Sequence, residues 1–121
     1  MARFEEIINR AAALGLPITE YEFRPTKDKP APDPPFIVWT STENQRGTDE
    51  RNRIREISAS IELYTDRKAD HDIERRIEEE VLFDTEFAKY GVFIQNENMY
   101  QTAYDFKIIQ KMKQKGEKEN V

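Results

Sequence analysis

The sequence predicts an α+β fold, in which a mostly antiparallel sheet of about five strands has two main helices packed on one face. Residues 3–14 and 66–82 carry apolar side chains at helical spacing. Residues 57–64 and 99–109 alternate apolar with polar side chains, as half-buried strands do. The predicted order is helix, strand, strand, strand, helix, strand, strand. This order lacks the regular alternation that builds a parallel α/β sheet.

The N-terminal region predicts one helix followed by one strand. Residues 3–14 place apolar side chains on one helical face, and Gly15 supplies a left-handed stop. Residues 18–23 alternate and predict a strand whose inward side chains are Tyr21 and Phe23.

Residues 24–53 are predicted to form a connector, a strand and a loop. Residues 24–35 hold five of the six prolines, which excludes a helix or a central strand because proline lacks the backbone donor. We therefore expect an extended proline-rich connector. Residues 36–42 are rich in β-branched and aromatic side chains and predict the second strand. Residues 43–53 are polar and charged, and they predict a long hairpin loop.

The second half of the sequence predicts a strand, a helix and a hairpin. After the strand at 57–64, a helix begins at Thr65 or Asp66 and ends near Leu82. Gly91 is expected to break the apolar connector that follows.

The closing hairpin consists of a short strand at 92–94, a turn at 95–98 and a last strand at 99–109. The whole arrangement corresponds to a single domain over residues 1–110, followed by a flexible basic C-terminal tail at 111–121.

Composition narrows the classes of function. The 121 residues include no cysteine, which excludes disulfides, thiolate zinc sites and thiol nucleophiles. The 19 Lys and Arg against 24 Asp and Glu, a net charge of −5, argue against a dedicated nucleic-acid binder. No apolar run approaches the ~20 residues of a membrane span, and the first residues lack the apolar stretch of a signal peptide. We therefore expect a cytoplasmic protein with no membrane partner.

The residues that could carry chemistry are few. His71 lies between Asp70 and Asp72, but consecutive helical residues point roughly 100° apart and do not converge on one metal ion. Asp70, Glu74 and Glu78 share a helical face, and nearby arginines favour a neutralised, exposed acidic face over a divalent-ion site. No phosphate loop or Ser-His-Asp pattern occurs in the sequence. We expect no catalytic, metal or cofactor site, and hence no enzyme.

Assembly is the function that the pattern favours. The predicted strands are amphipathic, their edges are not clearly blunted, and a charged loop extends from them. Such edges and loops favour pairing with copies of the same chain. The candidate residues for a subunit or tube interface lie in or beside the predicted hairpin loop: Arg46, Asp49, Glu50, Arg51 and Arg53.

Six short motifs follow one another along the chain: Leu16-Pro17-Ile18; Tyr21-Glu22-Phe23; Pro34-Pro35-Phe36-Ile37-Val38; Ile61-Glu62-Leu63-Tyr64-Thr65 with Lys68 and Asp70; Glu97-Asn98-Met99-Tyr100-Gln101; and Tyr104-Asp105-Phe106. Their order and spacing over residues 3 to 110 resemble the small tail-completion, or tail terminator, proteins of siphophages and related prophages. That family has no catalytic signature. The resemblance implies an α/β sandwich with two main helices and a mixed or antiparallel sheet.

The resemblance also implies a role in virion assembly. Its members form a ring, usually hexameric, that closes the head-proximal end of the tail tube and joins it to the head connector. The implied partners are further copies of the chain, the major tail tube protein and the head-connector or head-closure proteins. DNA passes through such a ring without specific binding. The implied location is the virion tail, after assembly in the cytoplasm of a host bacterium.

Several alternatives stay open at this point. The chain also resembles the head-closure and adaptor proteins of the neck. A small metal-dependent enzyme that processes nucleic acid would use His71 and the acidic helix. A regulatory module would bind its partner through residues 24–35. Within the ring interpretation, Asp70, Glu74 and Glu78 either line the lumen or face solvent.

Overall fold

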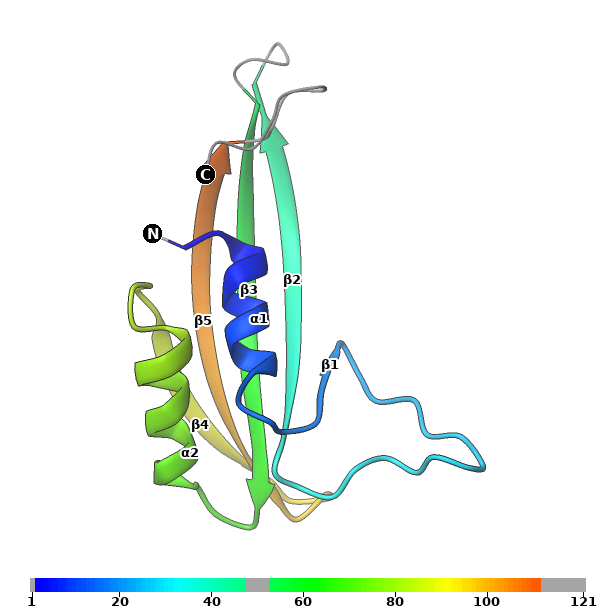
Figure 1. The fold of residues 1–121 in the computed structure, drawn as a ribbon. Helices are drawn as coiled ribbons and strands as arrows, with labels where there is room; N and C mark the ends of the chain where they lie inside the picture. The colour runs from blue at the N-terminus through cyan, green and yellow to red at the C-terminus, as the bar shows by residue number, and fades with distance from the viewer. Residues whose placement is uncertain (1, 48–52, 112–121) are drawn as a thin grey trace.

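The computed structural model describes residues 2–47 and 53–111 (Figure 1). Within these residues the chain forms a helical layer and a sheet. The elements, in order, are α1 (Phe4–Ala12), β1 (Ile18–Glu20), β2 (Phe36–Arg46), β3 (Ile54–Asp66), α2 (His71–Arg76), the π-helical turn η2 (Ile77–Val81), β4 (Ala88–Ile94) and β5 (Met99–Lys111).

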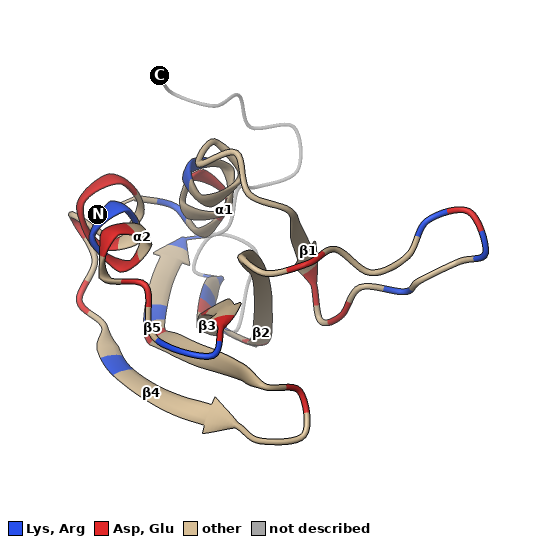
Figure 2. Cartoon of the chain, turned by 90° about the horizontal axis from the view of Figure 1, so that it is seen from below, with Lys and Arg blue, Asp and Glu red and all other residues tan. Residues whose placement is uncertain are grey.

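The five strands form one mixed sheet in the order β1-β2-β3-β5-β4. Strand β1 runs parallel to β2, and the other three neighbouring pairs are antiparallel. Figures 1 and 2 show α1 and α2 on the same face of this sheet. The predicted α+β class, with a mostly antiparallel sheet of five strands and two helices on one face, is confirmed.

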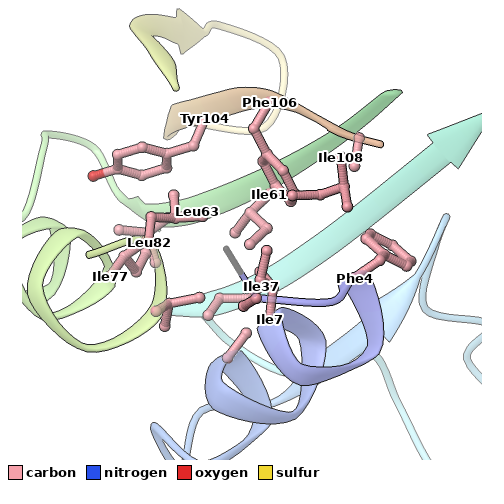
Figure 3. Close-up of a cluster of buried hydrophobic side chains, with 14 of the residues drawn as sticks. Phe4, Ile7, Ile37, Ile61, Leu63, Ile77, Leu82, Tyr104, Phe106 and Ile108 are labelled. Atoms are coloured by element: carbon pink, nitrogen blue, oxygen red, sulfur yellow. The ribbon is translucent and has the colours of Figure 1, made fainter. Parts of the chain in front are cut away.

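The hydrophobic core lies between the helices and the sheet (Figure 3). The helical layer presents Ile7, Ala11, Ile77, Val81 and, just after η2, Leu82. The strands present Ile37, Ile57, Ile61, Leu63, Tyr104 and Ile108, and all these residues are fully or almost fully buried. Along β3 and along β5 from Tyr104 onward these residues alternate with exposed or half-buried residues, which gives the sheet its apolar face toward the helices. Ala103 and Val38, which lie next to Tyr104 and Ile37, are buried as well. Each buried Val, Leu or Ile side chain contributes about 1.5–3 kcal/mol by leaving water.

The predicted start of the second helix is wrong. Strand β3 continues to Asp66 because Thr65 pairs with Tyr100 and Asp66 pairs with Met99. The chain then turns at Arg67, where φ is 66°. The helix begins only at His71, because the carboxylate of Asp70 accepts hydrogen bonds from the backbone N–H groups of residues 72 and 73, each at 3.1 Å.

The predicted hairpin loop at 43–53 is too long. Strand β2 reaches Arg46 and β3 starts at Ile54, so four residues assigned to the loop belong to a paired strand. Cross-strand ion pairs explain how so polar a segment forms a ladder. The guanidinium of Arg46 lies 2.7 Å from the Glu56 carboxylate, and that of Arg55 lies 2.7 Å from Glu43.

Two further predictions are corrected at the sheet edges. Strand β1 ends at Glu20, and Tyr21 adopts a left-handed φ of 68° with 60% of its surface exposed, so it does not point inward. Gly91 does not break the chain but lies inside β4. A Cβ atom there would collide with the ring of Tyr100, so the glycine makes room for an aromatic side chain that crosses the strand. Residues 24–35 form an extended arm without helix or strand, as predicted (Figure 1).

Candidate functional site

The acidic face predicted for the second helix is largely an internal polar cluster. Glu74 is only 3% exposed and therefore neither faces solvent nor lines a lumen, which corrects the prediction. Its carboxylate lies 2.9 Å from the ammonium of Lys89 and accepts a hydrogen bond of 3.0 Å from the Thr102 hydroxyl. The imidazole Nδ1 of His71 lies 3.1 Å away. Strand β4 supplies the lysine, so the contact forms only when the sheet meets the helix.

Glu78 completes this cluster one turn later. It is half-buried, and its Oε2 lies 2.7 Å from the Lys89 ammonium and 2.8 Å from the Tyr104 hydroxyl, which donates to it. We call Glu74, Glu78, Lys89, Thr102 and Tyr104 the acid cluster. A single lysine thus bridges two carboxylates that sequence spacing placed on an exposed face.

Opposing effects set the pKa values in the acid cluster. Burial alone raises the pKa of Glu74, but hydrogen bonds from Lys89, His71 and Thr102 outweigh it and hold the pKa below 4.5. Burial opposes the charge of Lys89 as well, yet the two carboxylates raise the pKa of its ammonium. Both groups are therefore charged at neutral pH. Burial and the Glu78 carboxylate raise the pKa of the Tyr104 phenol, which stays protonated.

Asp70 and His71 lie at the start of α2. Asp70 caps the helix, as described above, and His71 is 81% exposed in side-chain terms. Among the described residues, no group of three or more His, Asp or Glu side chains is arranged to hold a metal ion.

The predicted interface residues lie at one end of the β2–β3 hairpin. Arg46 ends β2 and is paired with Glu56, and Arg53 is exposed just before β3. Asp49, Glu50 and Arg51 lie outside the described residues. Sequence reasoning missed Arg55, which contacts Glu43 at 2.7 Å and Glu5 of α1 at 3.6 Å. Residues 54–57 read Ile-Arg-Glu-Ile, without apolar–polar alternation, so no local pattern marked Arg55 as part of a strand.

The sheet face opposite the helices has no helix over it among the described residues (Figure 2). It carries a hollow of about 790 Å³. Strands β2 and β3 line this hollow with hydroxyl side chains, and β5 lines it with one acidic and one basic side chain. The lining residues on this face include Thr40, Thr42, Ser58, Ser60, Asp105 and Lys107. Apolar side chains also reach solvent from this face, among them Tyr90, which is 51% exposed, Val92 and Ile109.

Both edges of the sheet are open within the described part of the chain. Strand β1 pairs with β2 only over residues 37–39, so residues 40–46 have no neighbouring strand on their outer side. At the other edge, β4 pairs with β5 alone, and every residue of β4 except Ile94 is exposed. Unpaired edges of this kind are templates for another strand.

No protein-family model matches this chain, and no curated protein shows significant similarity to it. Within residues 2–47 and 53–111, no helix has the length and apolar character that crossing a bilayer requires.

Proposed function

We propose that this chain is a non-enzymatic structural subunit of a phage or prophage, which assembles into a ring that caps the tail tube and joins it to the head connector. The observation that carries the proposal is the presence of two different open edges on one sheet. A subunit with two unlike, complementary patches forms head-to-tail contacts, and such contacts close into a ring when the rotation permits.

The charge distribution supports this proposal. The net charge of −5 disfavours adhesion to DNA that passes through a ring. The acid cluster supports the non-enzymatic part of the proposal, because Lys89, Thr102 and Tyr104 already bind the carboxylates of Glu74 and Glu78. These contacts tie α2 to the sheet and stiffen the subunit.

The β2–β3 hairpin is the proposed contact with the tail tube. It extends beyond the helical layer at one end of the molecule (Figure 1) and carries Arg46 and Arg53. The implied partners are the major tail tube protein on one side of the ring and the head-connector or head-closure proteins on the other. The proposed location is the head-proximal end of the virion tail.

Capping of tail tubes tests the proposal. The purified chain is mixed with tubes of the major tail tube protein encoded in the same genome, and the tube ends are viewed by negative-stain electron microscopy. We expect rings at one end of each tube. Arg53→Glu should abolish capping, whereas Arg24→Glu, the same charge change at an exposed position in the connector, should not.

Two results would redirect the assignment. Bare tube ends together with binding to the isolated head connector would favour the neck adaptor. A chain that stays monomeric with both partners present would contradict a ring-forming role altogether.

A further inference from the structure

The two open edges of the sheet present stretches of equal length. Residues 40–46 of β2 and Ala88–Ile94 of β4 are both seven residues long. Neither stretch contains proline. The one lysine in β4, Lys89, does not protect its edge, because its ammonium is held by Glu74 and Glu78 at 2.9 and 2.7 Å. Both edges therefore lack proline and an unpaired lysine, two of the devices that normally prevent pairing. The charges on the β2 stretch, Glu43 and Arg46, are paired within the chain with Arg55 and Glu56.

Hydrogen-bonding groups on the two edges also match. On β2, the N–H of Ile37 donates to Pro17 at 2.8 Å and the carbonyl of Trp39 accepts from Tyr21 at 2.9 Å. Odd-numbered residues of β2 thus direct their backbone groups outward. Along each strand, the backbone N–H and C=O groups of successive residues point alternately to one neighbouring strand and to the other. When this alternation is followed through the registers of β3 and β5, the backbone groups of the odd-numbered residues of β4 also point outward, away from β5.

The side-chain faces obey the same parity. Odd-numbered residues of β2 lie on the helix-covered face, where Ile37 and Trp39 join the core cluster. Odd-numbered residues of β4 lie on that face too, since Lys89 is paired with Tyr104. If the two seven-residue stretches pair along their whole length, odd-numbered residues lie opposite odd-numbered residues. The helix-covered face of one copy then continues into the helix-covered face of the next, and the opposite faces join in the same way.

We propose that β4 of one copy adds antiparallel to residues 40–46 of β2 in the next copy, with Gly91 opposite Glu43. The inference rests on the proposed function, because it names the contact that builds the ring. Strands β2 and β4 run in opposite directions within one sheet, so a neighbour in the same orientation meets this edge as an antiparallel partner. The contact is heterologous and hence yields rings or filaments, not closed dimers.

An exposed knob and a hollow coincide in this register. Phe93 of β4, 44% exposed, would stand opposite Ser41 on the helix-covered face. Beside Ser41 at the β2 edge lies a hollow of about 370 Å³. Its lining includes Phe4, Ile8, Trp39, Ser41 and Glu43. The aromatic ring of one copy would enter this hollow and contact the aromatic side chains of the next.

One existing contact lies across this edge. The Tyr21 hydroxyl donates to the Ser41 carbonyl at 3.3 Å. A carbonyl oxygen has two lone pairs and can also accept the N–H of Phe93 from the neighbour. On the sheet face opposite the helices, Val92 of one copy would lie opposite Thr42 of the next, which forms a cross-strand pair of β-branched side chains.

Cysteine cross-linking tests the register, since the natural chain has no cysteine. Thr42 and Val92 direct their backbone groups inward and would form a non-hydrogen-bonded pair, whose Cα atoms lie about 4.5 Å apart, within the range of a disulfide. Thr42→Cys and Val92→Cys are purified separately, mixed at a concentration at which the wild type forms oligomers, and oxidised. We expect a disulfide-linked dimer only in the mixture.

Matched mixtures make the result specific. Thr42→Cys mixed with Phe93→Cys should not cross-link, because these side chains lie on opposite faces of the joined sheet. Cross-linking of either single variant with itself would overturn the inference, because it would show that like edges pair. In size-exclusion chromatography, Phe93→Asp should shift the wild-type oligomer to monomer while leaving the circular dichroism spectrum unchanged.

The test separates this inference from the proposed function. Rings without the mixed cross-link would overturn the edge pairing and leave the ring-forming role standing. Cross-linked oligomers that fail to cap tail tubes would support the edge pairing and contradict the tail role.

Discussion

Glu74 and Glu43 are both carboxylates that contact a cation on another element of the fold, yet they lie in very different surroundings. Glu74 is buried between α2 and β4 and contacts Lys89, whereas Glu43 lies near the exposed end of the β2–β3 hairpin and contacts Arg55. Both carboxyl pKa values are lowered. For Glu43, the hydrogen bond from Arg55 dominates, while for Glu74 several donors must overcome burial. Pairing alone therefore does not show how much a charge stabilises the fold.

The largest effect is expected from removing the buried carboxylate. Glu74→Ala leaves Lys89 without one of its two partners and the Thr102 hydroxyl without its acceptor. We expect a loss of about 3 kcal/mol in the free energy of unfolding, measured with urea. Glu79→Ala, an exposed change in η2, should cost less than about 0.5 kcal/mol. Equal losses for the two variants would show that the acid cluster is not special.

Acid should remove the same contribution gradually. A carboxyl whose pKa is lower in the folded chain stabilises the fold fully above its unfolded pKa and loses that contribution as pH falls through the folded pKa. For Glu74 the unfolded value is near 4.5 and the folded value lies below it. The stability difference between wild type and Glu74→Gln should therefore be constant above this value and shrink towards lower pH. If the stability difference between wild type and Glu74→Gln grew as the pH fell, the pKa of Glu74 would not be lowered in the folded chain.

A smaller effect is expected at the tyrosine of the acid cluster. Tyr104→Phe removes the hydroxyl that donates to Glu78 but keeps the buried ring. We expect a loss of about 1.5 kcal/mol in thermal or urea unfolding, since the acceptor is charged. Tyr21→Phe removes an exposed hydroxyl and should be almost neutral. If Tyr104→Phe left the free energy of unfolding unchanged, the contact with Lys89 alone would be enough to stabilise the Glu78 carboxylate.

The smallest effect is expected on the hairpin. Arg46 is mostly exposed, and its pair with Glu56 is screened by water and salt. Arg46→Ala should cost about 0.5 kcal/mol or less, and raising the salt concentration should remove this loss. A loss as large as that of Glu74→Ala, unaffected by salt, would remove the contrast between the two regions.

Local periodicity accounts for the parts of the fold that were predicted correctly. The alternation around Ile61 and the helical spacing around Ile7 are properties of neighbouring residues, so the sequence shows them directly. Element ends were predicted less well, because partners decide them. Thr65 belongs to β3 because Tyr100 pairs with it, and Gly91 belongs to β4 because it pairs with Thr102. The Tyr100 ring occupies the space that a side chain at position 91 would need.

The candidate site follows the same rule. Spacing along the helix correctly grouped Glu74 with Glu78, but it could not show that Lys89 and Tyr104 lie against them, since these residues are 15 and 30 positions from Glu74. The charged character of residues 43–46 suggested a loop, yet partners in β3 made it a strand. The hollow beside Ser41 brings residues of α1 and β1 against the β2–β3 hairpin, a contact that spacing along the chain does not show.

The sequence by itself determined the α+β class, the helix-covered face of the sheet and the net negative charge, because apolar spacing and composition are read locally along the chain. Only the tertiary structure decided which carboxylate is buried, where β2 ends, where β3 begins and ends, where β4 begins and which edges of the sheet stay open. Those features depend on contacts between residues far apart in sequence, and a one-residue shift of register would have moved every side chain to the other face.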